Sequence, residues 1–210
     1  MTLSNAVWYS DFMAVDFDKI ISLAQGRVLR AKELAPLGIA RYHLRDLIEA
    51  GRLNRIGRGL YMAAGAEITE HQSLVEVASR SPKAVFCLLT ALRFHGLTTE
   101  NPESVYLLLP KGWQRPMNST IMLDVFWASG ASYSEGIEEH TISGVTVKVT
   151  SPAKTVADCF KFRSSIGVPV GVEALREVWQ KKKATSDELW RFAKICRMTQ
   201  VMRPYFDAII

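Results

Sequence analysis

Residues 26–62 constrain the fold more than any other stretch, because short helical and strand patterns alternate there with proline and glycine breaks. The expected elements are a strand over 27–29, a helix over 32–35, a tight turn at 36–38, and a second helix over about 40–50. Gly51 follows the second helix and can adopt the left-handed conformation that ends helices. The sequence thus predicts two short helices joined by a turn.

A hairpin is expected directly after these helices. The apolar runs 53–56 and 60–62 flank Gly57-Arg58-Gly59, and a glycine-rich turn between two short apolar runs is a hairpin signal. Strand, helix, turn, helix and hairpin, in this order, are the elements of a winged helix-turn-helix. The hairpin would be the wing.

The second helix has two different faces. At about 100° per residue its apolar face holds Ala40, Leu44, Leu47 and Ile48, and the opposite face holds Tyr42, Arg45, Asp46 and Glu49, flanked by Arg41. Helix-turn-helix proteins insert the start of this helix into the DNA major groove, where arginine can bond bidentately to guanine. Base-reading candidates are therefore Arg41, Tyr42 and Arg45.

The remaining arginines of this segment suit contacts to phosphates or to the minor groove. Those on the helix exit and wing are Arg52, Arg55 and Arg58, and two more, Arg27 and Arg30, precede the first helix. Residues 26–62 contain eight lysines and arginines against three acids, which equals the net charge of +5 of the whole chain. A solvated surface is the usual fate of scattered charge, but this concentration favours a double-stranded DNA partner.

The length of 210 residues favours two domains, with residues 1–63 as the winged domain and residues 67–210 as a second domain. In the first domain, Phe17, Ile20, Ile21 and Ala24 form one helical face, with Asp16 as a cap, and residues 1–15 are apolar enough to pack somewhere.

The second domain alternates helical and strand patterns. A capping box at 69–72 opens a helix, and the stripe Val85, Leu88, Leu89 and Leu92 predicts another that ends at Gly96. Strands are expected at 105–109, 121–127, 137–142 and 145–149, followed by helices from Ser151 and over 172–181 and 186–199. The expected fold class is α+β, with a winged helix-turn-helix followed by a small sheet flanked by helices.

No cofactor or metal is expected. The three cysteines and four histidines are scattered without ligand spacing, so buried thiols in a reducing cytoplasm are the better interpretation. The sequence has neither a signal peptide pattern nor a membrane-length apolar run, which also favours the cytoplasm.

The sequence also offers two enzymatic alternatives. Ser151-Pro-Ala-Lys154 matches the SxxK pattern of acyl enzymes but lacks the partner motifs, and helix capping explains the serine. A metal-dependent nuclease could use Asp124 and Lys148, yet Thr146 stands where a second acid is expected. No catalytic residue is therefore assigned.

A further hypothesis concerns a second basic face on the C-terminal helices. It would consist of Lys181, Lys182, Lys183, Arg191, Lys194, Arg197 and Arg203. Such a face could extend the DNA footprint or hold another macromolecule.

Three runs together resemble the AbiEi family of bacterial antitoxins: LGIARYHLRDLIEAGRLNRIGRGLYM, LLTALRFHGLTTENPESVYLLLPKG and ISGVTVKVTSPAKTVADCF. The resemblance implies a winged domain that represses its own operon by binding inverted repeats. It also implies a C-terminal domain that counters a nucleotidyltransferase-like toxin of a type IV toxin-antitoxin (abortive infection) system without forming a stable complex. When the family's functional motif is matched to this sequence position by position, only the recognition helix and the wing arginines correspond to it.

The leading hypothesis is thus a sequence-specific repressor and antitoxin, not an enzyme. The alternatives are a nuclease or hydrolase with a winged targeting domain, and a winged module that binds protein.

Overall fold

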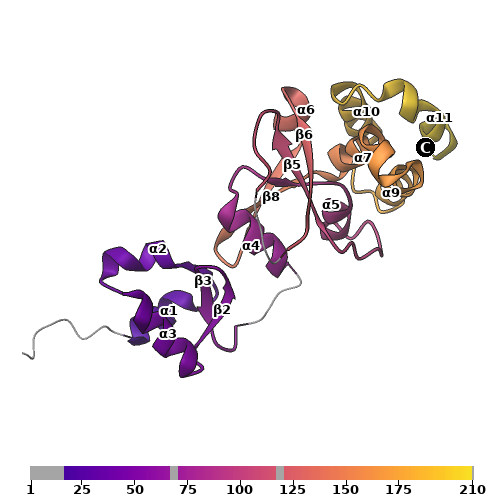
Figure 1. Cartoon of the computed structure of the whole chain (residues 1–210). Helices are drawn as coiled ribbons and strands as arrows, with labels where there is room; N and C mark the ends of the chain where they lie inside the picture. The colour runs from indigo at the N-terminus through magenta and orange to yellow at the C-terminus, as the bar shows by residue number, and fades with distance from the viewer. Residues whose placement is uncertain (1–16, 67–70, 117–120, 210) are drawn as a thin grey trace, which may run out of the picture. The chain divides into compact units, whose positions relative to one another are not determined.

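The computed structural model of the chain describes residues 17–66, 71–116 and 121–209 (Figure 1). Contacts divide the chain into two compact units, Met1–Gln72 and Ser73–Ile210. The predicted α+β fold class is confirmed, since each unit combines helices with its own sheet. Residues 1–15, Asp16 and the start of the predicted capping box at 69–72 lie outside the described residues.

The first unit contains three α-helices, one 3-10 turn and three strands in its described part (Figure 1). They are α1 Phe17–Ala24, β1 Leu29–Arg30, α2 Ala31–Leu34, η1 Ala35–Leu37, α3 Arg41–Glu49, β2 Leu53–Gly57 and β3 Leu60–Ala63. The sheet has the order β1-β3-β2, with antiparallel pairing throughout. Strand β1 begins two residues later than predicted, and the hairpin pairs as the glycine pattern indicates.

The core of the first unit gathers one face of each helix against the sheet. Ile20 and Ala24 of α1 are fully buried, as their spacing predicts, and Leu44 and Leu47 of α3 are 2% and 3% exposed. Leu34 of α2 packs in the same cluster. Burial of these side chains fixes which side of α3 points inward, and hence which side faces solvent.

The second unit is built on a five-stranded mixed sheet with the order β6-β5-β4-β8-β7. Its strands are β4 Val85–Phe86, β5 Val105–Pro110, β6 Leu123–Ala128, β7 Ile137–Ile142 and β8 Val145–Thr150. Strands β5 and β6 run parallel, as do β4 and β8, whereas β7 and β8 form the predicted antiparallel hairpin.

Helices surround this sheet and fill most of the C-terminal part of the chain (Figure 1). They are α4 Gln72–Arg80, α5 Leu88–Phe94, α6 Ala131–Ser134, α7 Pro152–Lys161, α8 Arg163–Ile166, α9 Val168–Gln180, α10 Ser186–Ile195 and α11 Thr199–Ile209. Helix α7 packs against α5, α9, α10 and α11. In the part of the chain that the structure describes, no helix is long and apolar enough to cross a membrane.

Three predicted helices of the second unit were wrong in extent, and the one expected over 172–181 begins already at Val168. Val85 and Phe86 form the central strand β4, because Phe86 pairs with Leu107 on one side and Val149 on the other. Helix α5 therefore begins only at Leu88. The last predicted helix, 186–199, ends at Ile195, and Arg197 takes a left-handed conformation with φ of 60° before α11 begins.

Gly136 lies in the second unit where the surrounding atoms leave no room for a side chain. A Cβ atom placed there would lie 2.6 Å from the Phe192 ring and 2.8 Å from Cβ of Lys154, and the backbone has φ of +69°. Gly96, just beyond α5, has nearly the same φ of +68° but nothing within 4 Å of such a Cβ. A comparison of alanine substitutions at these two glycines therefore separates the effect of backbone strain from the effect of packing.

We predict that Gly136→Ala destabilises the second unit more than Gly96→Ala. Both substitutions strain a left-handed backbone, but only the first also overpacks the core, which costs about 1–3 kcal/mol further. Urea unfolding followed by circular dichroism measures the difference, and equal losses for the two variants would contradict the packing at Gly136.

Candidate nucleic-acid interface

The helix-turn-helix segment is closed by local hydrogen bonds. The Gly38 amide donates to the Ala35 carbonyl at 3.1 Å, and the Ile39 amide donates to the Leu34 carbonyl at 3.2 Å. Gly38 has φ of 72°, a conformation that residues with a Cβ rarely adopt. The chain can therefore reverse sharply and present the start of α3 at the surface.

His43 fixes the first turn of α3. The Ala40 amide donates a hydrogen bond to Nδ1 of His43 at 3.1 Å, so the imidazole satisfies the backbone N–H of the residue that precedes the helix. The His43 ring also contacts Tyr42 and Phe17, with centroids 3.9 Å and 5.9 Å away. Sequence reasoning missed this role, although a histidine three residues after the cap position was the available signal.

The outward face of α3 carries the three base-reading candidates. Arg41 and Arg45 are exposed, and Tyr42 is 58% exposed, which is unusual for a side chain of its size. Arg45 Nε lies 3.6 Å from a carboxylate oxygen of Glu49, and both side chains are largely solvated. Such a pair contributes little to stability, so the guanidinium remains available to a partner.

The wing presents two further arginines. Strands β2 and β3 pair from Leu53 opposite Ala63 to Gly57 opposite Leu60, with a bulge between Arg55 and Gly57. Arg58 lies at the exposed tip next to Gly59, whose φ is 74°. Arg55 is also exposed, and its Nε donates to the Gly57 carbonyl at 3.2 Å. Bulges redirect side chains, and here one lies between the two arginines.

The other three candidate arginines have partners within the first unit. Arg52 forms an ion pair of 2.5 Å with Asp18, which ties the exit of α3 to α1. Arg27 and Arg30 both approach Glu33, at 3.9 Å each. Among the described residues, by contrast, Arg41 and Arg58 have no ion-pair partner. The structure thus separates arginines that have an ion-pair partner within the first unit from arginines of α3 and the wing that have none among the described residues.

Residues 18–64 match a family model described as "Transcriptional regulator, AbiEi antitoxin". The match confirms the family resemblance for the segment that contains α1 to β3. No curated protein matches the chain in sequence.

A solved structure extends the similarity in fold to most of the chain. The crystal structure of the RV2827C protein from Mycobacterium tuberculosis aligns with a TM-score of 0.58 at 13% identity, covering 84% of this chain and 70% of that one. At this identity the likeness shows a shared architecture.

The residues of the nuclease alternative are not brought together. Asp124 lies on β6 and Lys148 on β8, and strands β5 and β4 stand between them. Asp124 accepts a hydrogen bond of 2.5 Å from the Ser104 hydroxyl, and Lys148 pairs with Glu139 at 3.0 Å. Within the described residues, no group of three or more His, Cys, Asp and Glu side chains is placed to hold a metal ion.

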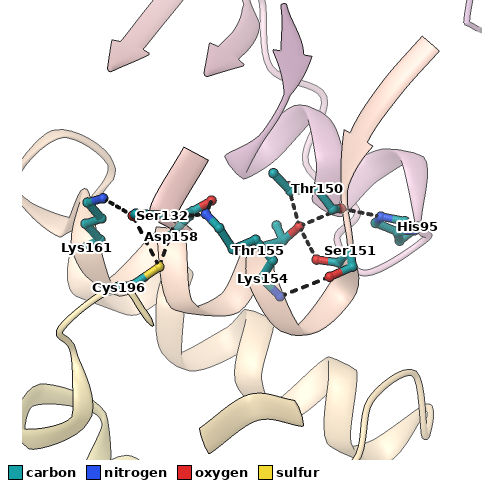
Figure 2. A network of polar contacts seen from close by, with 9 residues as sticks. All are labelled: His95, Ser132, Thr150, Ser151, Lys154, Thr155, Asp158, Lys161 and Cys196. Carbon is teal, nitrogen blue, oxygen red and sulfur yellow. Dashed lines mark hydrogen bonds and ion pairs between the residues drawn. The ribbon is translucent and has the colours of Figure 1, made fainter. Parts of the chain in front are cut away.

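Ser151 caps α7, as the sequence predicts. Its hydroxyl accepts a hydrogen bond from the Lys154 amide at 3.4 Å. Figure 2 shows that the Lys154 ammonium points instead to Asp158, at 2.5 Å, and both side chains are fully buried. An SxxK acyl enzyme needs its lysine beside the serine hydroxyl, and this lysine is held elsewhere.

A polar network surrounds this buried pair (Figure 2). Cys196 Sγ lies 3.5 Å from Asp158, and Ser132 Oγ connects Cys196 to Lys161. Burial raises the pKa of Asp158, an effect that the neighbouring Lys154 opposes. Burial and the Asp158 carboxylate also raise the pKa of the Cys196 thiol to about 11, so it is a poor nucleophile.

The expected second basic face is partly engaged within the chain. Lys181 pairs with Glu177 at 2.8 Å and donates to the Gly96 carbonyl at 2.7 Å. Arg191 pairs with Glu135 at 2.6 Å. Fewer cations of this second basic face are therefore available to a partner than the sequence indicates.

We predict that Lys154→Met lowers the unfolding free energy of the second unit by about 3–5 kcal/mol, because it leaves Asp158 buried without its cation. The double variant Lys154→Met/Asp158→Leu should recover most of this loss. Tryptophan fluorescence in urea measures it, since four of the five tryptophans lie beyond residue 72.

The matched control is Lys148→Met, which breaks the exposed pair with Glu139. It should change stability by no more than about 1 kcal/mol. Similar losses for Lys154→Met and Lys148→Met would show that the buried pair has no special role.

Proposed function

We propose that this protein is a sequence-specific transcriptional repressor that binds operator inverted repeats through its first unit. The observation that carries the proposal is the outward face of α3, where Arg41, Tyr42 and Arg45 are exposed beside a wing with free arginines. The family match over residues 18–64 supports a regulator with antitoxin activity.

The proposed mode of binding follows from this arrangement. With α3 in the major groove, Arg41 and Arg45 can each donate two parallel hydrogen bonds to a guanine, and Tyr42 can meet a phosphate or a thymine methyl group. Arg55 and Arg58 on the wing reach phosphates or the minor groove, with Arg27, Arg30 and Arg52 adding positive potential. The helix specifies the sequence, and the wing supplies affinity.

The biological role extends this proposal. We infer that the chain autoregulates its operon through a winged domain at 1–63, while a domain at 67–210 counters a nucleotidyltransferase-like toxin of a type IV system without a stable complex. A repressor of this kind works in the cytoplasm, where the DNA is. No catalytic step is assigned to the antitoxin.

The experiment is a gel shift of the purified chain with DNA from upstream of its own gene, with and without Mg²⁺. Retardation of an inverted repeat without cleavage supports the repressor. Metal-dependent cleavage that disappears in Asp124→Ala would favour the nuclease alternative instead. If no upstream sequence is retarded, the alternative in which the winged unit binds protein is favoured.

We predict that Arg45→Ala weakens operator binding by about 1–3 kcal/mol and relaxes the base preference at one position, because one bidentate contact is lost. Fluorescence anisotropy with the operator and its single-base variants measures both effects. Glu49→Ala is the control: it removes the partner of Arg45 but keeps the guanidinium, so specificity should persist.

We predict that Arg58→Ala weakens binding evenly across sequences and flattens the slope of log K against log salt by about one unit, as expected when one phosphate contact is lost. Arg176→Ala removes the same charge from an exposed position in the second unit, outside the second basic face, and should leave the slope unchanged. An identical response of both variants would contradict a phosphate contact by the wing.

A further inference from the structure

A hollow in the second unit opens where two parallel strands end. The last pair of β5 and β6 is Pro110 opposite Ala128, and the Lys111 amide donates to the Ala128 carbonyl at 2.8 Å. The loops that leave both strands line the hollow, which has a volume of about 660 Å³. The carboxyl ends of neighbouring parallel strands are a common place for ligands, and a hollow of this size accommodates a nucleotide.

The lining of this hollow is positively charged. Lys111, Lys161 and Arg197 contribute to it, and no carboxylate is found among its described lining residues. The Lys161 ammonium donates to Ser132 Oγ, which holds it at the wall of the hollow (Figure 2). Cations gathered in a concave site without acids attract phosphate groups.

An aromatic ring stands at the same hollow. Trp127 lines it and is 44% exposed, although a tryptophan is normally buried in a unit of this size. Its indole Nε1 donates to the Trp113 carbonyl at 2.9 Å, so the ring is held in place while part of it faces solvent. A fixed, exposed indole offers a surface on which a base can stack.

A second hollow, of about 600 Å³, is lined by the rest of the same loop. Trp113 is 48% exposed there, and the Lys83 ammonium lies 4.1 Å from its ring centroid. Arg80 adds another cation, and the described lining again contains no carboxylate. The pattern of an exposed tryptophan with neighbouring cations is therefore repeated on both sides of residues 111–116.

We propose that these two hollows form a binding site for single-stranded nucleic acid in the second unit. One base stacks on Trp127 while Lys161 and Arg197 hold the adjoining phosphates, and the strand continues towards Trp113. A duplex is a poorer ligand, because its bases already stack on one another and cannot cover the indole rings. The site uses none of the residues assigned to operator binding.

Arg197 allows a clean test of this site. Its backbone has φ of 60°, so Arg197→Gly removes the guanidinium and relieves backbone strain at once. Lys182 provides a matched control, because it is also exposed and basic, has φ of 51°, and lines a different hollow. Trp179 lines that third hollow too and is the control for Trp127.

The experiment measures anisotropy of a fluorescein-labelled oligouridine RNA of about 12 nucleotides, a length within the usual range for single-strand sites, with the full chain. Unlabelled strand should displace the probe. The same strand annealed to its complement, UTP at equal nucleotide concentration, and inorganic phosphate should compete poorly.

Among the variants, Trp127→Leu should weaken binding about tenfold, as the loss of one stacked base does. Arg197→Gly should weaken binding and flatten the salt slope by about 0.7, the value for one phosphate of a single strand. Trp179→Leu and Lys182→Gly should bind like the unmodified protein. Operator binding should be unchanged in the two tryptophan variants, which alter neither the winged unit nor the second basic face, so failure here and failure of the repressor proposal are distinguishable.

The proposal is overturned if Arg197→Gly binds the probe like the unmodified protein, or no differently from Lys182→Gly. Because Arg197→Gly relaxes the backbone, it decides the matter even if Trp127→Leu fails to fold. Full competition by the duplex would place the probe on the winged unit, and full competition by UTP would indicate a free nucleotide as the ligand. Either result also contradicts a single-strand site.

Discussion

The second unit depends on one buried ion pair, Lys154 with Asp158, at the centre of α7. Two charges removed from water are costly, and they are tolerated here because each satisfies the other within a single turn of helix. Helix α7 packs against α5, α9, α10 and α11, so four helices lie around an element whose interior is charged. Both charges lie on α7 and satisfy each other within that helix, and Cys196 Sγ, at the end of α10, lies 3.5 Å from the Asp158 carboxylate (Figure 2). Loss of either charge would leave the other buried without its partner.

The first unit was largely predictable from its sequence, because its signals are local. Helical periodicity placed Leu44 and Leu47 inward, and the glycines at the turns marked the ends of α3 and of the hairpin. What failed was non-local. The run from Val85 to Leu92 is apolar except for Thr90, and only pairing with β5 and β8 makes its start a strand. The partner of Arg52 is Asp18, 34 residues away, so the sequence could not tell a bracing arginine from a free one. Lys154 and Asp158 have the spacing of a surface pair, and their burial depends on helices that come later in the chain.

The arginines of the first unit fall into two groups, those with an ion-pair partner within the unit and those without one among the described residues. Arg52 pairs with Asp18 between the exit of α3 and α1, whereas Arg27 and Arg30 both pair with Glu33 of α2. Arg41 and Arg58 need no such partners for the unit to form. If α3 reads DNA as proposed, Arg41 and Arg58 are available to it without first breaking an ion pair among the described residues. In the second unit, some cations lie instead beside indole rings in concave sites, as Lys83 does next to Trp113.

The three cysteines, Cys87, Cys159 and Cys196, are all buried, and burial raises the pKa of each thiol. Thiol reagents act on the thiolate, so the folded chain should resist maleimides at neutral pH. A single cysteine added to the surface of this chain could therefore be labelled selectively. One cysteine introduced at the wing tip could carry a fluorophore, a spin label or a cross-linker at a defined place beside the candidate DNA-binding face, without first replacing any native cysteine.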